Sequence, residues 1–173
     1  NRMGATLASI EIVSSGDQVL GVAFTPDGSQ LWVAYTGLLT KVIDTARGSP
    51  TFGTQIATLP MHPSDNVGPI AVDPLGRYMV QGDYAFADSL HLYRPVPIDV
   101  PVAAIEVGGW IKGIVISPDG HFVVSAGQGQ VNIGDLDTFA ALPAPAPHGS
   151  TTSRDWSIAI PLNGRRAVVR YPD

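Results

Sequence analysis

The four histidines of this sequence are the side chains best suited to metal binding or proton transfer. They are His62, His91, His121 and His148. A protein metal site needs three or four converging ligands, and no second histidine stands at ligand spacing from His62. His91 alternates within an apolar segment, and His121 directly follows a turn. The pattern therefore predicts no histidine metal site.

Two pairs of aspartates are candidate calcium ligands, Asp83 with Asp88 and Asp135 with Asp137. Calcium is bound in proteins by six to eight oxygen atoms, and neither pair has further acidic residues beside it. Aspartate near a turn more often accepts hydrogen bonds from the local backbone. We interpret both pairs as structural and predict no bound metal.

Motifs for nucleophilic catalysis or phosphate binding are missing. The chain has no cysteine, no Gly-x-Ser-x-Gly elbow and no phosphate-binding loop. The segment Gly127-Gln128-Gly129 is a tight turn between two apolar runs. No catalytic residue and no cofactor are predicted, and whether the chain is an enzyme stays open.

A four-residue turn motif repeats along the chain and shows which elements must position any site. Its glycines are 48, 44 and 44 residues apart, a spacing typical of the blades of a β-propeller. The four copies are Thr25-Pro26-Asp27-Gly28, Asp73-Pro74-Leu75-Gly76, Ser117-Pro118-Asp119-Gly120 and Pro161-Leu162-Asn163-Gly164.

Apolar runs flank each copy of the motif, so each copy predicts a β-hairpin. Proline presets φ for a turn, Asp or Asn bonds to the local backbone, and glycine supplies a positive φ. Runs such as 20–24 and 31–35 are nearly continuous in apolar residues, which is typical of strands buried on both faces.

Two further strands complete each repeat unit, giving an all-β chain with four antiparallel strands per blade. Strands are expected after the hairpins at 39–44, 89–93 and 130–136, and before them at 6–13, 54–59, 102–107 and 139–142. We assign each preceding strand to the hairpin that follows it. One propeller domain or fragment then spans 1–173, with blades at about 5–48, 49–97, 98–138 and 139–173.

At these residues the chain resembles the YVTN family of bacterial β-propellers. The segment Gly113-Ile114-Val115-Ile116-Ser117-Pro118-Asp119-Gly120 is similar to the family repeat, and Lys41-Val42-Ile43-Asp44-Thr45 is similar to its closing strand. The resemblance implies a propeller fold. Family relatives include surface-layer-like proteins, lactonases and cofactor-dependent dehydrogenases, so it does not select one function.

The repeat is least uniform just before each hairpin, where the second strand of a blade begins near the funnel of a propeller. This variable position supplies two tryptophans and several polar side chains: Asn66, Trp110, Lys112, Arg154, Asp155 and Trp156. They are candidates for an aromatic, polar ligand pocket. The alternative is that they are ordinary rim residues whose tryptophans pack against the edge.

The last blade is expected to lack its fourth strand, because only three strands are predicted over 139–173. An open sheet edge exposes backbone groups that other strands can pair with. Three explanations stay open: a fragment of a larger propeller, completion by another chain, or a compact four-bladed ring.

Composition limits the classes of partner. The net charge of −5 gives no support to nucleic-acid binding, and no apolar run approaches the ~20 residues of a membrane span. We expect a non-enzymatic binding or scaffold module, extracellular or periplasmic in a bacterium, with a protein or glycan partner. The alternatives are a lactonase-like hydrolase, a redox-cofactor-dependent dehydrogenase, or a structural subunit of a surface layer or filament.

Overall fold

The computed structural model describes residues 18–36, 39–59, 67–83, 89–95, 101–127, 130–143, 157–161 and 168–170. In these ranges every regular element is a strand. None of the described residues forms a helix long and apolar enough to cross a membrane. The predicted strand at 6–13 lies outside the described residues.

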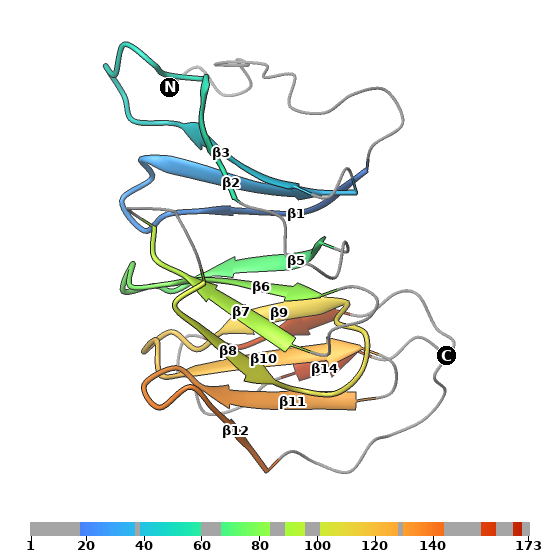
Figure 1. Cartoon of the computed structure of the whole chain (residues 1–173). Helices are drawn as coiled ribbons and strands as arrows, with labels where there is room; N and C mark the ends of the chain where they lie inside the picture. The colour runs from blue at the N-terminus through green and yellow to red at the C-terminus, as the bar shows by residue number, and fades with distance from the viewer. Residues whose placement is uncertain are drawn as a thin grey trace.

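Three four-stranded antiparallel sheets and one two-stranded sheet follow one another along the chain (Figure 1). The first sheet contains β1 (Val19–Phe24), β2 (Gln30–Tyr35), β3 (Leu39–Asp44) and β4 (Gln55–Thr58). The second contains β5 (Val67–Val72), β6 (Met79–Asp83), β7 (Ser89–Tyr93) and β8 (Ala103–Glu106). The third contains β9 (Gly113–Ile116), β10 (Phe122–Gly127), β11 (Gln130–Asp135) and β12 (Ala140–Leu142), and the fourth β13 (Ser157–Ala159) and β14 (Val168–Arg170).

The grouping of strands differs from the predicted blade boundaries of 5–48, 49–97, 98–138 and 139–173. Strands β4, β8 and β12 pair with the preceding β3, β7 and β11, so each sheet begins with a hairpin and ends with its outer strand. In the third sheet only residues 136–139 separate β11 from β12. Such a short connection returns the chain beside the strand it has just left.

The predicted hairpin turns are confirmed in the first three sheets. In each, the amide of the turn glycine donates to the carbonyl of the first motif residue at 2.8 Å, from Gly28, Gly76 and Gly120. Their φ values of 70°, 72° and 77° lie in the left-handed region that favours glycine. Strands β13 and β14 pair on either side of the fourth copy, but residues 162–167 between them lie outside the description.

The continuous apolar run at 31–35 is buried in β2, as predicted, but the run at 20–24 forms β1, in which Val22 and Phe24 are exposed because no described sheet covers their face. The second sheet is the one that lies between two others. Met79 and Tyr93 pack towards the first sheet, together with Trp32 and Val42. The next residue on β6, Val80, packs towards the third sheet with Ile105. Successive side chains of a strand point to opposite faces, so a strand between two sheets needs apolar residues at consecutive positions.

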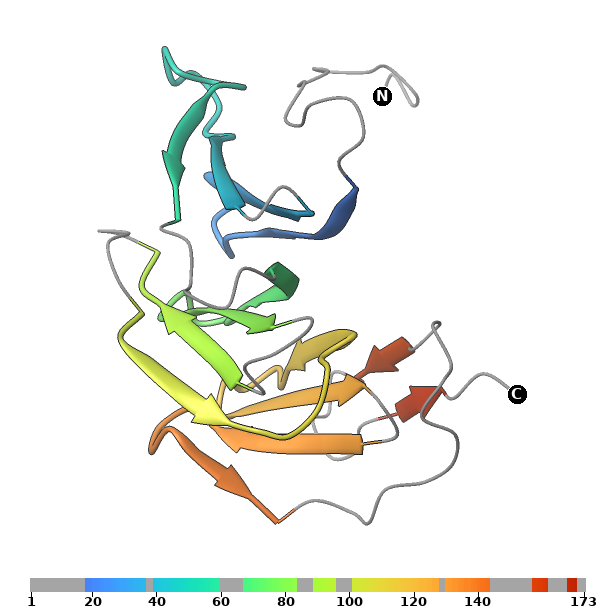
Figure 2. The ribbon, with the colours of Figure 1, turned by 45° about the vertical axis from the view of Figure 1, so that its right-hand side comes forward.

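The first strands of the sheets lie side by side. The amide of Ile70 on β5 lies 3.1 Å from where a Cβ on Gly21 of β1 would stand. The Ile158 side chain of β13 lies 3.1 Å from the same position on Gly113 of β9. Figure 2 shows the sheets fanning outward from this row of inner strands.

Candidate functional site

The predicted rim site is only partly within the described residues. Asn66, Arg154, Asp155 and Trp156 lie outside them, so the convergence of all six side chains stays a prediction. Trp110 and Lys112 are described and lie just before β9, at the end of the sheet away from the glycine turns. This is the position that the repeat alignment predicts for them.

Trp110 is held by its backbone and leaves its ring accessible. Its carbonyl oxygen packs so closely on Gly127 that a Cβ there would stand 1.7 Å from it. The side chain is 41% exposed, and the Lys112 ammonium lies 5.5 Å from the centre of the indole ring. Between them Ile111 is buried in the core. The alternation places an aromatic ring and a cation together on the rim.

The other candidate ligand sets lie only partly within the described residues. Among the described residues no group of three or more His, Cys, Asp or Glu side chains could hold a metal ion. His62, His148 and Asp88 lie outside the description, and nothing is described of the Asp83 side chain.

Asp135 and Asp137 separate into two structural roles. The Asp135 carboxylate accepts hydrogen bonds from the amides of Asp137 and Thr138, each at 2.8 Å. These bonds lower the pKa of Asp135 and support its interpretation as a turn residue. Asp137 points instead to Arg77 and His121.

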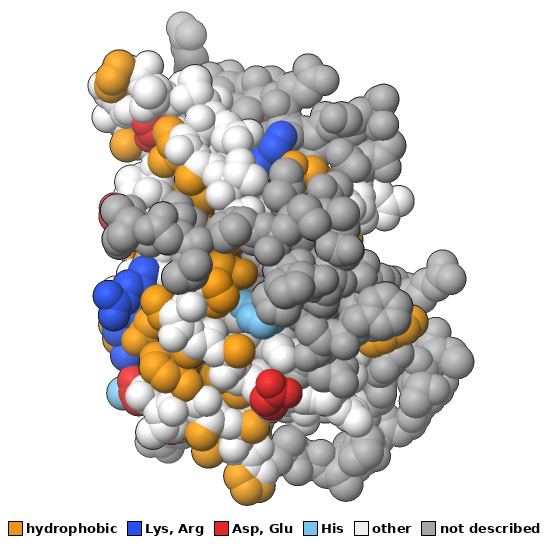
Figure 3. Space-filling model, in the orientation of Figure 1, with side chains coloured by type: hydrophobic (Ala, Val, Ile, Leu, Met, Phe, Trp, Pro, Cys, Tyr) orange, Lys and Arg blue, Asp and Glu red, His pale blue; other side chains and the backbone are white. Residues whose placement is uncertain are grey.

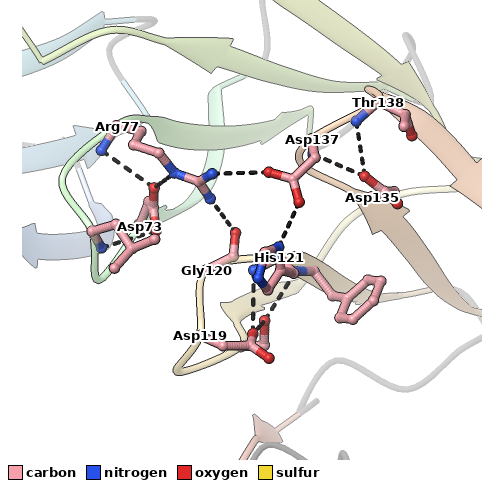
Figure 4. Close-up of polar contacts among 11 residues, drawn as sticks. Asp73, Arg77, Asp119, Gly120, His121, Asp135, Asp137 and Thr138 are labelled. Carbon is pink, nitrogen blue, oxygen red and sulfur yellow. Dashed lines mark hydrogen bonds and ion pairs between the residues drawn. The ribbon is translucent and has the colours of Figure 1, made fainter.

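A polar network joins the turns of the second and third sheets (Figure 4). The Arg77 guanidinium donates to Asp73 at 2.7 Å and to Asp137 at 2.9 Å, and also to the carbonyl of Gly120. His121 contacts the second oxygen of Asp137. In Figure 3 basic, acidic and histidine side chains gather at this edge of the molecule, where the turns lie.

Each charge of the network stabilises the ionised form of its neighbour. The Asp73 carboxylate, followed by Asp137, raises the pKa of Arg77 above its ordinary value. His121, followed by Arg77, lowers the pKa of Asp137. Asp137 in turn raises the pKa of His121. Arg77, Asp137 and His121 are thus each favoured in their charged forms by their oppositely charged neighbours.

One departure from the repeat creates this network. In the first and third turns, Thr25 and Ser117 donate their hydroxyls to the third-position carboxylates of Asp27 and Asp119. In the second turn the carboxylate stands at the first position, as Asp73, and Leu75 takes the third. Asp73 is completely buried and accepts from the amides of Leu75 and Arg77. The sequence shows Leu75 where the first and third turns have Asp. It does not show that Arg77 bonds to Asp73 and to Gly120 of the third turn.

The corresponding junction between the first and second sheets is hollow. A cavity of about 310 Å³ lies there, between the two turns. Its walls come from both turns and from the end of β7: Thr25, Pro26, Asp27, Ser29, Gln30, Leu75, Gly76 and Pro95. The sequence analysis did not predict this cavity, because it depends on how two turns 48 residues apart pack together.

No protein-family model matches the chain, and no curated protein matches its sequence. Among solved structures, hydrazine synthase from Kuenenia stuttgartiensis, which contains a β-propeller, matches with a TM-score of 0.72 and 20% sequence identity. The match covers 95% of this chain and 45% of that one. The fold is a β-propeller.

The sheets are therefore propeller blades of antiparallel strands, as predicted, three with four strands and one with two described strands. The strand at 139–142, predicted to open the fourth blade, is instead β12 of the third. Membership of the YVTN family is not confirmed, since no family model matches. The chain spans less than half of the hydrazine synthase chain, and at 20% identity the likeness shows the fold alone. As many as 948 chains of known structure match this fold, so the propeller by itself does not select a function.

Proposed function

We propose that the chain is a non-enzymatic β-propeller module that binds a partner protein through the rim of its inner strands. The observation that carries the proposal is the exposed Trp110 ring beside Lys112. Tryptophan is enriched among residues that dominate binding energy, and a rim fixed by backbone packing loses little entropy on binding. A glycan, also expected from the sequence, would use the same aromatic face.

The charge at the rim indicates the character of the partner. The Lys112 ammonium is positive, although the whole chain carries a net charge of −5. An acidic group beside an apolar surface would therefore complement both members of the pair. We place the module outside the cytoplasm of a bacterium, a proposal that rests on the YVTN-like repeat.

The test compares two exposed aromatic residues at opposite ends of the third blade. The tagged protein is purified from its source, and the associated proteins are quantified. Trp110→Ala should lose a partner that the unaltered protein and Phe122→Ala both retain, because Phe122 is similarly exposed, at 39%, but lies beside the turn. The double change at Trp110 and Trp156 should have the larger effect if both line the rim. Retention of every partner by the Trp110 variants would exclude the rim as the binding site.

The same preparation tests the enzymatic alternatives. A stoichiometric metal or a visible chromophore in the purified protein would favour the lactonase-like or redox enzyme. Elemental analysis and an absorbance spectrum measure both.

We further propose that additional blades, from the same or another chain, pack against β1. Val22 and Phe24 of β1 are 59% and 58% exposed, whereas their equivalents Ile70 and Ile116 are each 7% exposed. Contiguous exposed apolar side chains mark interaction surfaces. Phe24→Ser should lower the melting temperature of the assembled protein or reduce the mass of the assembly, which light scattering measures. A melting temperature and a mass that are both unchanged would contradict the proposal.

A further inference from the structure

The cavity between the first two turns occupies the place that an arginine fills at the next junction. Ser29, Arg77 and His121 each follow the glycine of their turn. The strand registers make Pro95 equivalent to Leu136, since Met79 pairs with Tyr93 and Val123 with Gly134. Gly76 and Pro95 of the cavity wall thus stand at the same repeat positions as Gly120, which Arg77 contacts, and Leu136, which precedes Asp137.

One difference between the two junctions is the length of the side chain that follows the turn glycine. Arg77 reaches from the second turn to the carbonyl of Gly120 in the third turn and to Asp137 beyond it. Ser29 stands at the same point of the first turn, and among the described residues its hydroxyl bonds within that turn, to Asp27 at 2.9 Å and to the Thr25 hydroxyl at 3.5 Å. The cavity remains because Ser29 is short, whereas Arg77 and His121 are long at the same position of their turns.

The walls suit a flat cation. Pro26, Leu75 and Pro95 supply apolar surface, and the faces of a guanidinium group pack well on such surface. Asp27 supplies a carboxylate, and its pKa is lowered to about 2 by the hydroxyl of Thr25 and by Ser29. The Asp27 Oδ1 accepts three hydrogen bonds, one from the Thr25 hydroxyl and two from the amide and the hydroxyl of Ser29. In the described part of the chain Oδ2 accepts none.

We propose that this cavity binds the guanidinium group of an arginine side chain presented by a partner protein. Arg77 shows within the same molecule how a guanidinium sits between two turns. Asp27 provides the charge, in place of Asp73 and Asp137. This site is separate from the Trp110 rim, which lies at the other end of the sheets, so either proposal can fail without the other.

The test is a titration with three small probes, followed by the backbone amide NMR signals of the whole chain. N-acetyl-L-arginine N-methylamide stands for an arginine within a protein. The corresponding citrulline derivative has the same shape without the charge, and free L-arginine represents a small-molecule source. The arginine derivative should shift the signals of residues 25–30, 75 and 76 with a dissociation constant in the millimolar range, and citrulline should not.

Two variants locate the binding. Asp27→Asn should weaken binding of the arginine derivative roughly 10-fold or more, the usual effect of losing a charged hydrogen-bond partner. Asp119→Asn is the matched control, because Asp119 makes the same turn contacts with Ser117 and His121; it should leave binding unchanged. Ser29→Arg should fill the cavity and abolish binding.

Four results would overturn the proposal. One is an arginine derivative that shifts no signal of the two turns. Another is equal binding of the arginine derivative to the Ser29→Arg or Asp27→Asn variant. A third is equal shifts with the citrulline derivative, which would show that the cavity does not select a cation. Clearly tighter binding of free L-arginine than of its capped derivative would overturn the assignment to a protein partner.

Discussion

The two junctions between neighbouring turns are built from the same repeat and yet differ in packing. Between the second and third sheets, Arg77 spans the gap and bonds to both sides. Between the first and second sheets, Ser29 leaves a cavity of about 310 Å³. The turn backbones are alike, but the side chains differ at three positions of the turn: Thr25, Asp27 and Ser29 in the first, against Asp73, Leu75 and Arg77 in the second. A repeat can therefore keep its fold while one junction is closed and the next is left open.

Between the two junctions, the turn glycine of the closed one gives the largest expected effect. A Cβ on Gly120 would stand 2.6 Å from the Asp73 carboxylate, which is buried and bonded, whereas a Cβ on Gly76 would meet nothing nearer than Pro26 at 3.8 Å. Both glycines have nearly equal positive φ, so the backbone penalty of alanine is matched. Gly120→Ala should cost about 3 kcal/mol of unfolding free energy and Gly76→Ala about 1 kcal/mol. Denaturant unfolding measures both, and equal losses would show that the two junctions are packed alike.

Removal of the bridging side chain should come next. Arg77→Ala leaves the buried Asp73 without its cation and should cost about 2 kcal/mol. The matched change Ser29→Ala removes a hydroxyl bond within one turn and should cost less than about 1 kcal/mol. The same unfolding measurement applies. An Arg77→Ala variant as stable as Ser29→Ala would mean that the network contributes nothing to joining the blades.

Filling the open junction should act in the opposite direction. Ser29→Arg places a guanidinium beside Asp27 and the apolar wall of Leu75, and should raise the melting temperature only slightly, because an exposed ion pair contributes little. Ser29→Gln, of similar length without charge, is the control. A gain with glutamine as large as that with arginine would attribute the effect to filled volume alone.

The smallest effect is a pH dependence of the closed junction. Asp137 raises the pKa of His121 above 6.5, with Asp119 adding to the rise and Arg77 opposing it. The stabilisation is therefore complete below pH 6.5 and is lost as the pH rises through the raised pKa. Both side chains are about half exposed, so the change should be small. The melting temperature of the protein should exceed that of His121→Gln at about pH 5.5 and match it at about pH 8; a constant difference would contradict the ion pair.

Much of the fold could be predicted because its signals are local. The spacing of four turn glycines predicts blades, and the continuous apolar run at 31–35 predicts a strand buried on both faces, as β2 is over residues 32–35. The similar run at 20–24 is partly exposed in β1. Local signals could not predict to which sheet the outer strands β4, β8 and β12 belong. Residues 55–58 read equally well as the start of one blade or the end of another, and only hydrogen bonds to β3 decide between them.

The candidate site at the rim stays a prediction, for which the structure describes two of the six residues. The repeat places Trp110 and Lys112 before an inner strand, and the structure adds their mutual contact and the backbone packing on Gly127. Asn66, Arg154, Asp155 and Trp156 stay predictions as members of the same site. The Arg77 network was missed, because Arg77 and Asp137 are 60 residues apart and nothing in their local sequence links them.

The sequence by itself determined the repeat, the hairpins and the all-β architecture, because turn chemistry and apolar periodicity act over a few neighbouring residues. Tertiary structure alone decided which strand closes each sheet and which junction is bridged. It also decided where a cavity remains. Those features depend on contacts between side chains far apart in the chain, and a single arginine or serine at one turn position has no preferred partner until the blades have packed.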